Sequence, residues 1–303
     1  MKAPTQHIAV SALLLIASLP AARAFTAAED FSAYTAPTAF TNTALLNSAG
    51  AGTAGTGADG NGWLNGWRTS TSTGLAQTVG VQNTTPVNSG GNYLSATILT
   101  KSTSGDTIKD STSVARAYDA AGGDLATATA LNISFDFRVD SIDAANMRYD
   151  LFENLNRATG ATSTSFNFRT SSGVWNYFDG ANFVATTMTF EAGTTYAFSI
   201  DLDPVNSTYT FTLGNGTTSV SSVSAAAFRT TGFGTDTSTG SDGGRWLTFN
   251  ANETTNVLGQ TTSFSVDNIL ITTSTIPEPS AAALVMGLTT LGLVSVRRRA
   301  TRA

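Results

Sequence analysis

Hydrophobic and polar residues alternate along several short segments of this chain. The clearest segment is 131–140, LNISFDFRVD, in which five apolar positions alternate with five polar ones. A period of two is typical of a β-strand with one face in a core and the other in solvent. The pattern recurs in TTYAFSIDLDP (194–204) and in STYTFTLGNGTTSVSS (207–222), where Gly-Asn-Gly predicts the turn of a hairpin.

Shorter segments extend the same interpretation: TSFNFRT (164–170), GVWNYF (173–178), RWLTFNA (245–251) and TSFSVDNILITT (262–273). In the last segment the alternation changes phase at Asp267-Asn268, which predicts a β-bulge. No long segment of the central chain has the 3.6-residue period of an amphipathic helix. We therefore expect an all-β fold, an antiparallel β-sandwich, over residues 25–274.

The two ends of the chain have a different composition. Residues 1–24 begin with a basic residue, continue with an apolar run and end in Ala22-Arg23-Ala24. This is the pattern of a secretory signal peptide with an A-x-A cleavage site, so we expect Ala22 and Ala24 to mark the cleavage and the mature chain to begin at residue 25. An uncleaved anchor is the alternative.

The C-terminal segment 275–303 contains an uncharged run, 280–296, followed at once by arginines. As a helix the run would be about 25 Å long, at the short end of the range for spanning a bilayer. The arginines favour a cytoplasmic end for a transmembrane helix. A buried C-terminal helix of a soluble domain is the alternative interpretation.

The parts of this segment resemble a known sorting signal. Pro277, Glu278 and Pro279, an apolar helix of this length, and Arg297, Arg298 and Arg299 together resemble the PEP-CTERM signal, also called the ice-binding protein C-terminal domain. The resemblance implies export by the secretion machinery, transient anchoring in the membrane, and processing by an exosortase of a Gram-negative bacterium that makes exopolysaccharide. It implies a final place at the cell surface or in the extracellular matrix.

The central segment has a second resemblance, at the level of the fold. EDFSAYTA (29–36), GNGWLNGW (60–67), GGNYLSA (90–96) and FSVDNILI (264–271) are similar to parts of concanavalin-like, or LamG-like, jelly-roll domains. Such domains often hold a structural calcium ion where the first and last strands meet. The resemblance implies Asp30 and Asp267 as calcium ligands. The alternative is that Asp267 caps the bulge and Asp30 is a solvated carboxylate.

Composition excludes several kinds of chemistry. The chain has no cysteine, and His7, its only histidine, lies in the signal peptide. The mature chain therefore cannot use Ser-His-Asp or Cys-His catalysis, and it cannot bind zinc through His or Cys. Between residues 25 and 276 there are 10 basic and 20 acidic residues, a net charge of −10. We expect no nucleic-acid partner, because such a surface repels phosphate backbones.

Two aromatic clusters are candidates for carbohydrate binding, because exposed rings stack on sugars. The first is Trp63 with Trp67, and the second is Trp175 with Tyr177 beside Asp179. Both could instead be core residues.

The spacing of the acidic residues argues against catalysis. No paired Glu/Asp motif of the sandwich glycosidases is present, so we expect no enzymatic activity. The threonines have no regular T-x-T period of the kind that a flat ice-binding face needs. The leading hypothesis is a non-enzymatic, exopolysaccharide-associated surface or matrix protein. A carbohydrate-binding module and a carboxylate-based glycan hydrolase or lyase are the alternatives.

Overall fold

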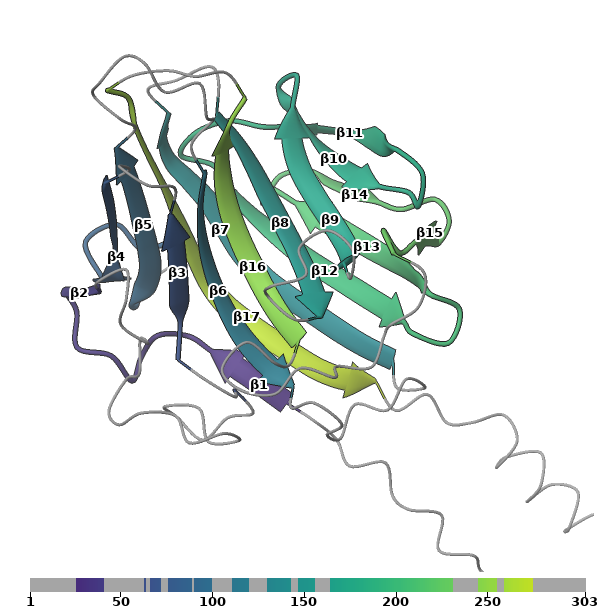
Figure 1. Ribbon diagram of the computed structural model, residues 1–303, viewed down its shortest axis with the longest axis horizontal. Coiled ribbons are helices and arrows are strands. Elements are labelled where there is room, and N and C mark those ends of the chain that lie inside the picture. Colours follow the sequence, from purple (N-terminus) through teal and green to yellow (C-terminus); the bar gives the residue numbers. More distant parts are fainter. Residues whose placement is uncertain are drawn as a thin grey trace, which may run out of the picture.

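The two-residue alternation of the sequence corresponds to two antiparallel β-sheets in the computed structural model (Figure 1). The structure describes residues 26–40, 63, 66–71, 76–88, 90–99, 111–119, 130–142, 147–155, 164–230, 245–254 and 259–274. In Figure 1 the sheets form two layers. The all-β fold and its two antiparallel sheets confirm the sandwich expected from the sequence.

The ten-stranded sheet has the order β14-β13-β12-β7-β17-β5-β4-β2, with β1 paired to β17 and β15 to β13. Its strands are β1 (Thr26–Glu29), β2 (Thr38–Phe40), β4 (Ala76–Gln82), β5 (Tyr93–Leu99), β7 (Ala130–Ile142), β12 (Thr195–Asp203), β13 (Thr208–Gly214), β14 (Ser219–Ser221), β15 (Ala226–Ala227) and β17 (Thr261–Ser274).

The seven-stranded sheet has the order β11-β10-β9-β8-β16-β6-β3. Its strands are β3 (Arg68–Thr71), β6 (Ser111–Asp119), β8 (Met147–Leu155), β9 (Thr164–Ser171), β10 (Val174–Phe178), β11 (Phe183–Thr189) and β16 (Arg245–Glu253).

The core lies between the sheets and is rich in aromatic rings. Phe135 of β7 stacks on Phe198 of β12 with ring centroids 4.9 Å apart, and it meets Phe249 of β16 edge-on at 5.2 Å. Phe249 belongs to the other sheet, so these contacts join the two layers. The residues that alternate with these rings face away from the core, as the sequence pattern predicts.

The bulge predicted in the last strand is present. The pairing of β17 with β7 shifts register between Asp267 and Leu270, and Asn268 adopts a φ of 51°. Asparagine tolerates this left-handed conformation better than most residues do. The extra residue returns Ile269 and Ile271 to the core, where both are buried.

Two glutamates of the interior form buried ion pairs. Glu29 of β1 contacts Arg116 of β6 and so joins the two sheets. Glu153 of β8 is fully buried and pairs with Arg245 of β16, and it also accepts a hydrogen bond from the Tyr118 hydroxyl at 2.9 Å. Burial, with the nearby Glu153 charge, raises the pKa of Tyr118 well above its ordinary value. Both glutamates hold structural positions.

The predicted sorting and processing signals lie outside the described residues. This applies to Ala22 and Ala24, to Pro277–Pro279, to the run 280–296 and to the arginines that follow it. Within the ranges that the structure describes, no helix is long and apolar enough to cross a membrane. The signal peptide, the transmembrane helix and the sorting signal stay predictions.

Candidate functional site

The three candidate tryptophans do not form a stacking surface. Trp63, Trp67 and Trp175 have no exposed area. Trp63 donates a hydrogen bond to the Ala28 carbonyl at 2.8 Å, and its ring lies under the Arg116 guanidinium. We correct the prediction that these rings bind sugar, because all three are part of the core. Large aromatic side chains stabilise a core through the apolar surface area that they bury.

The neighbours of Trp175 have structural contacts as well. Tyr177 is half-buried and packs on Phe211, with ring centroids 4.9 Å apart. Asp179 is exposed and accepts the backbone N–H groups of Asn182 and Ala181, and these hydrogen bonds lower its pKa. Asp179 therefore caps the turn between β10 and β11, and this cluster does not present a flat aromatic platform.

The candidate calcium ligands lie near each other at the junction of the first and last strands. Glu29 of β1 pairs with Ile269 of β17, which brings Asp30 beside the bulge that contains Asp267. Asp30 accepts hydrogen bonds from the Ser32 amide and hydroxyl. Burial raises the pKa of Asp267 to about 6, and the nearby charges of Asp136 and Asp30 act in the same direction. The hydrogen bond from the Asn268 backbone N–H opposes this rise.

A cavity of about 390 Å³ opens beside this junction, lined by Asp30, Ser32 and Asn268 among others. Within the described part of the chain, no three His, Cys, Asp or Glu side chains are grouped closely enough to hold a metal ion. Calcium needs six to eight oxygen ligands, which backbone carbonyls and water would have to complete. The calcium site stays a prediction.

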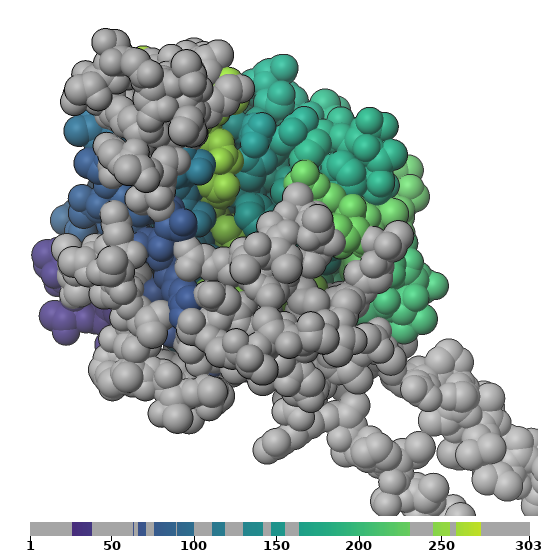
Figure 2. Space-filling model, in the orientation of Figure 1, coloured from purple at the N-terminus to yellow at the C-terminus, as the bar shows by residue number. Residues whose placement is uncertain are grey.

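A site that the sequence did not suggest lies on the outer face of the seven-stranded sheet, the face turned away from the core. Three strands and one loop contribute to it: Arg148 and Asp150 from β8, Asn167 and Arg169 from β9, Asn250 from β16, and Arg229. We call these six residues the arginine face. Figure 2 shows the teal segment that contains β8–β11 at the molecular surface.

The register of the strands explains why these residues meet. Asp150 is paired with Arg169 on one side and with Asn250 on the other, so the three lie in one row across the sheet. Phe152 is paired with Asn167 in the next row. Alternate residues of each strand point to the same face, and neighbouring strands are about 4.8 Å apart. Five of the six residues of the arginine face line a cavity of about 170 Å³, together with Phe152, Thr164 and Asn252.

The cavity contains polar atoms without hydrogen-bond partners in the protein. Asn167 is 3% exposed, yet its Oδ1 has no partner, and the same holds for Oδ1 of Asn250 and Nε of Arg169. Buried polar atoms are nearly always paired, because an unpaired one costs about 1–3 kcal/mol. Unpaired acceptors and donors that line or border a cavity are the groups that a polar ligand would satisfy.

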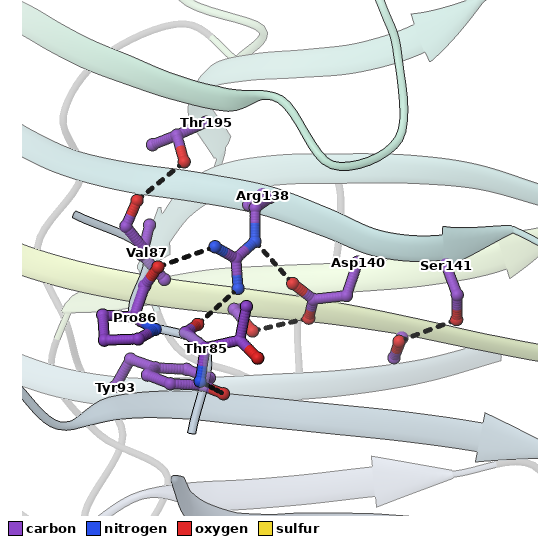
Figure 3. Close-up of polar contacts among 10 residues, drawn as sticks. Thr85, Pro86, Val87, Tyr93, Arg138, Asp140, Ser141 and Thr195 are labelled. Atoms are coloured by element: carbon purple, nitrogen blue, oxygen red, sulfur yellow. Dashed lines mark hydrogen bonds and ion pairs between the residues drawn. The ribbon is translucent and has the colours of Figure 1, made fainter. Parts of the chain in front are cut away.

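Three arginines elsewhere in the described structure, Arg116, Arg138 and Arg245, have carboxylate partners. On the outer face of the ten-stranded sheet, Arg138 contacts Asp140 at 2.6 Å (Figure 3). It also donates to the carbonyls of Pro86 and Thr85 at 2.8 and 2.7 Å, which fastens the loop between β4 and β5. Arg138 is therefore satisfied by its own chain and has a structural role.

Comparison with known proteins gives no family for this chain. No family model and no curated protein matches it. A protein of unknown function from Shewanella oneidensis MR-1 is 14% identical, covers 82% of this chain and 86% of its own, and has a TM-score of 0.47. The catalytic domain of a glycoside hydrolase family 131 protein from Coprinopsis cinerea is 13% identical, with coverages of 64% and 76% and a TM-score of 0.42.

A sialidase is 14% identical with a TM-score of 0.44; the match covers 84% of this chain but only 19% of the sialidase. These identities and TM-scores assign no substrate and no reaction to this chain.

The comparisons correct the prediction that this protein is not an enzyme. Besides the sialidase and the family 131 hydrolase, similar structures include a family 7 alginate lyase and a carbohydrate esterase of bacteriophage phi24B. The prediction rested on the absence of one acidic motif. The absence of that one motif does not exclude enzymatic activity.

Proposed function

We propose that this is an exported cell-surface protein that associates with polysaccharide through the arginine face. The observation that carries the proposal is the cavity with unpaired amide oxygens on Asn167 and Asn250. Sugar hydroxyl groups both donate and accept hydrogen bonds, so they can pair with these oxygens and with the arginines. Phe152, which also lines the cavity, supplies apolar surface for the C–H face of a sugar ring.

The test is binding of the purified full-length protein to a panel of polysaccharides, measured by calorimetry or by co-sedimentation. Asn250→Ala should weaken binding about tenfold, because it removes one hydrogen-bonding side chain from the site. Thr97→Ala is the matched control, since Thr97 is exposed on the opposite sheet. If no polymer binds, or if both variants bind as the wild type does, the arginine face is not the binding site.

The same experiment can detect catalysis. Each polymer that binds is incubated with the protein, and the release of reducing ends is followed over time. Shortened chains that the Asn250→Ala variant does not produce would show that the site cleaves the polymer as well as binding it.

The export and sorting part of the proposal rests on the two ends of the sequence. We propose that the signal peptide directs secretion and that the PEP-CTERM-like tail holds the protein in the membrane until an exosortase removes it. The mass of the protein in the wild type and in an exosortase-deletion strain tests this. Retention of the intact tail in both strains would refute sorting without affecting the binding proposal.

A further inference from the structure

The arginine face is positively charged in a domain that is otherwise acidic. Three of the ten basic residues between positions 25 and 276 gather there. Its one carboxylate, Asp150, already accepts from Arg148 at 2.8 Å and from the Asn252 amide at 2.6 Å. No ion pair of Arg169 or Arg229 occurs with any residue that the structure describes.

Two phenylalanines hold these two guanidinium groups in place. The Arg169 guanidinium lies 3.4 Å from the Phe183 ring centroid. Arg229 lies 5.5 Å from the ring of Phe178 and 5.8 Å from that of Phe183, and the two rings meet edge-to-face at 5.2 Å. Stacking uses the flat face of a guanidinium and leaves its N–H edge free to donate. The two cations are therefore oriented before any ligand binds.

The crowding of cations makes a bound anion favourable. The pKa of Arg169 is lowered, first by burial and then by the charge of Arg148; the charge of Asp150 opposes this, and Arg229 adds a smaller lowering. An anion between these groups would offset the repulsion and would accept the hydrogen bond that Nε of Arg169 lacks. A neutral sugar could accept hydrogen bonds but could not balance the charge.

From this geometry we infer that the polysaccharide bound at the arginine face carries carboxylate groups, as a polyuronate does, and that Arg169 and Arg229 receive them. The inference rests on the proposed function of the same face. A carboxylate has one negative charge and two coplanar oxygens, which match the N–H edge of one guanidinium. The hydroxyl groups of the same sugar are then available for the free oxygens of Asn167 and Asn250. Arg169 and Arg229 would thus determine specificity, and the asparagines would contribute to binding any sugar.

The experiment compares polymers that differ only in the carboxylate. Full-length protein is titrated with alginate and with polygalacturonate, and with the methyl-esterified form of each. Masking the carboxylates should weaken binding roughly ten- to hundredfold, the range expected for a charge-assisted hydrogen bond. Arg169→Gln should remove most of the difference between acid and ester, and Arg229→Gln should act in the same direction.

Two further variants separate geometry from net charge. Arg169→Lys keeps the charge but loses the planar N–H edge, so the preference for the acid should fall substantially. Thr97→Glu on the opposite sheet changes the net charge by as much as Arg169→Gln does, and it should leave the preference intact. Circular dichroism and the unfolding midpoint show whether each variant is folded.

The possible outcomes distinguish the inference from the function on which it rests. Equal binding of acid and ester, with binding still lost in Asn250→Ala, would overturn the carboxylate assignment and leave the polysaccharide site standing. Equal binding of alginate and dextran sulfate at matched charge would also overturn it, because the face would then attract any anion. Absence of binding to every polymer would refute both.

Discussion

The buried network around Glu153 allows a sharp prediction about stability. Glu153→Gln removes a negative charge but keeps the size of the side chain. Arg245 is 2% exposed, so its guanidinium would stay in the core without a carboxylate partner. Burial is the largest single effect and acts against the charge of Arg245, but the Glu153 charge, the Tyr118 charge and the hydrogen bonds to both together outweigh it and raise the Arg245 pKa. In the wild type, therefore, Arg245 stays charged beside Glu153.

The magnitude follows from the burial of both groups. Removing one member of a buried ion pair costs about 3–5 kcal/mol, against about 5–15 kcal/mol for the whole stability of a typical domain. The Tyr118 and Ser165 hydroxyls donate to different oxygens of Glu153, so the single oxygen of the glutamine would keep an acceptor for only one of them. The loss thus combines the compensation of charge with one hydrogen bond. We expect Glu153→Gln to lose about 3 kcal/mol or more.

Urea unfolding followed by tryptophan fluorescence measures this loss, because all four tryptophans are fully buried and become exposed on unfolding. Two control variants belong in the experiment. Asp201→Asn removes a charge at an exposed hydrogen bond to Asn132 and should cost less than about 1 kcal/mol. The double variant Glu153→Leu/Arg245→Met should regain much of the loss, since apolar residues can replace a buried pair. A loss below about 1 kcal/mol in Glu153→Gln would refute the view that Arg245 depends on this charge.

Three other predictions follow from the structure. Trp175→Ala should destabilise the protein by about 3–5 kcal/mol in the same urea assay, as expected for a ring taken from a packed core; normal stability would contradict its burial. With a chelator present, the free energy of unfolding should fall as pH rises from about 4 to about 6 and then level off, because the folded-state pKa of Asp267, about 6, lies above its ordinary value of 3.8. The full shift corresponds to about 3 kcal/mol, which solvent screening reduces to about 1–2 kcal/mol; an Asp267→Asn variant should lose this dependence, and an unchanged profile would count against the shift. Arg138→Gln should speed hydrogen exchange in the loop between β4 and β5, which Arg138 fastens through the Thr85 and Pro86 carbonyls, and unchanged exchange would show that the loop is held by other contacts.

The sequence predicted those features that depend on local alternation. Three features follow from the order of apolar and polar residues along the chain: the strand segment Leu131–Asp140, the hairpin around Gly214–Gly216 and the bulge at Asp267-Asn268. The same local pattern could not decide whether Trp175 faces a core or solvent. A tryptophan on the apolar side of a strand is compatible with a buried position and with an exposed one. Trp175 is buried because the second sheet, through residues such as Phe137, covers that side of the strand.

The arginine face could not be found in this way. Arg148, Arg169 and Arg229 lie on separate elements, and each looks in sequence like an ordinary outward-facing polar residue. They converge only when β8 and β9 pair in the correct register and the segment after β15 lies along β9, where the Arg229 amide donates to the Ser165 carbonyl. One sequence signal was available: few arginines remain in so acidic a chain, and a strand-bound arginine without an obvious acidic neighbour is worth examining.

The pairing of β1 with β17 determines how the domain would respond to mechanical force. Thr26 is opposite Thr272, so the chain enters and leaves the described sandwich at adjacent points. Tension transmitted through the residues after Ser274 would act along β17, which is hydrogen-bonded to β7 on one side and to β5 and β1 on the other. Such a load shears many backbone hydrogen bonds at once instead of opening them one by one. A domain tethered from this end would therefore resist a pull along the axis of β17 better than a pull that peels β17 away from its neighbours.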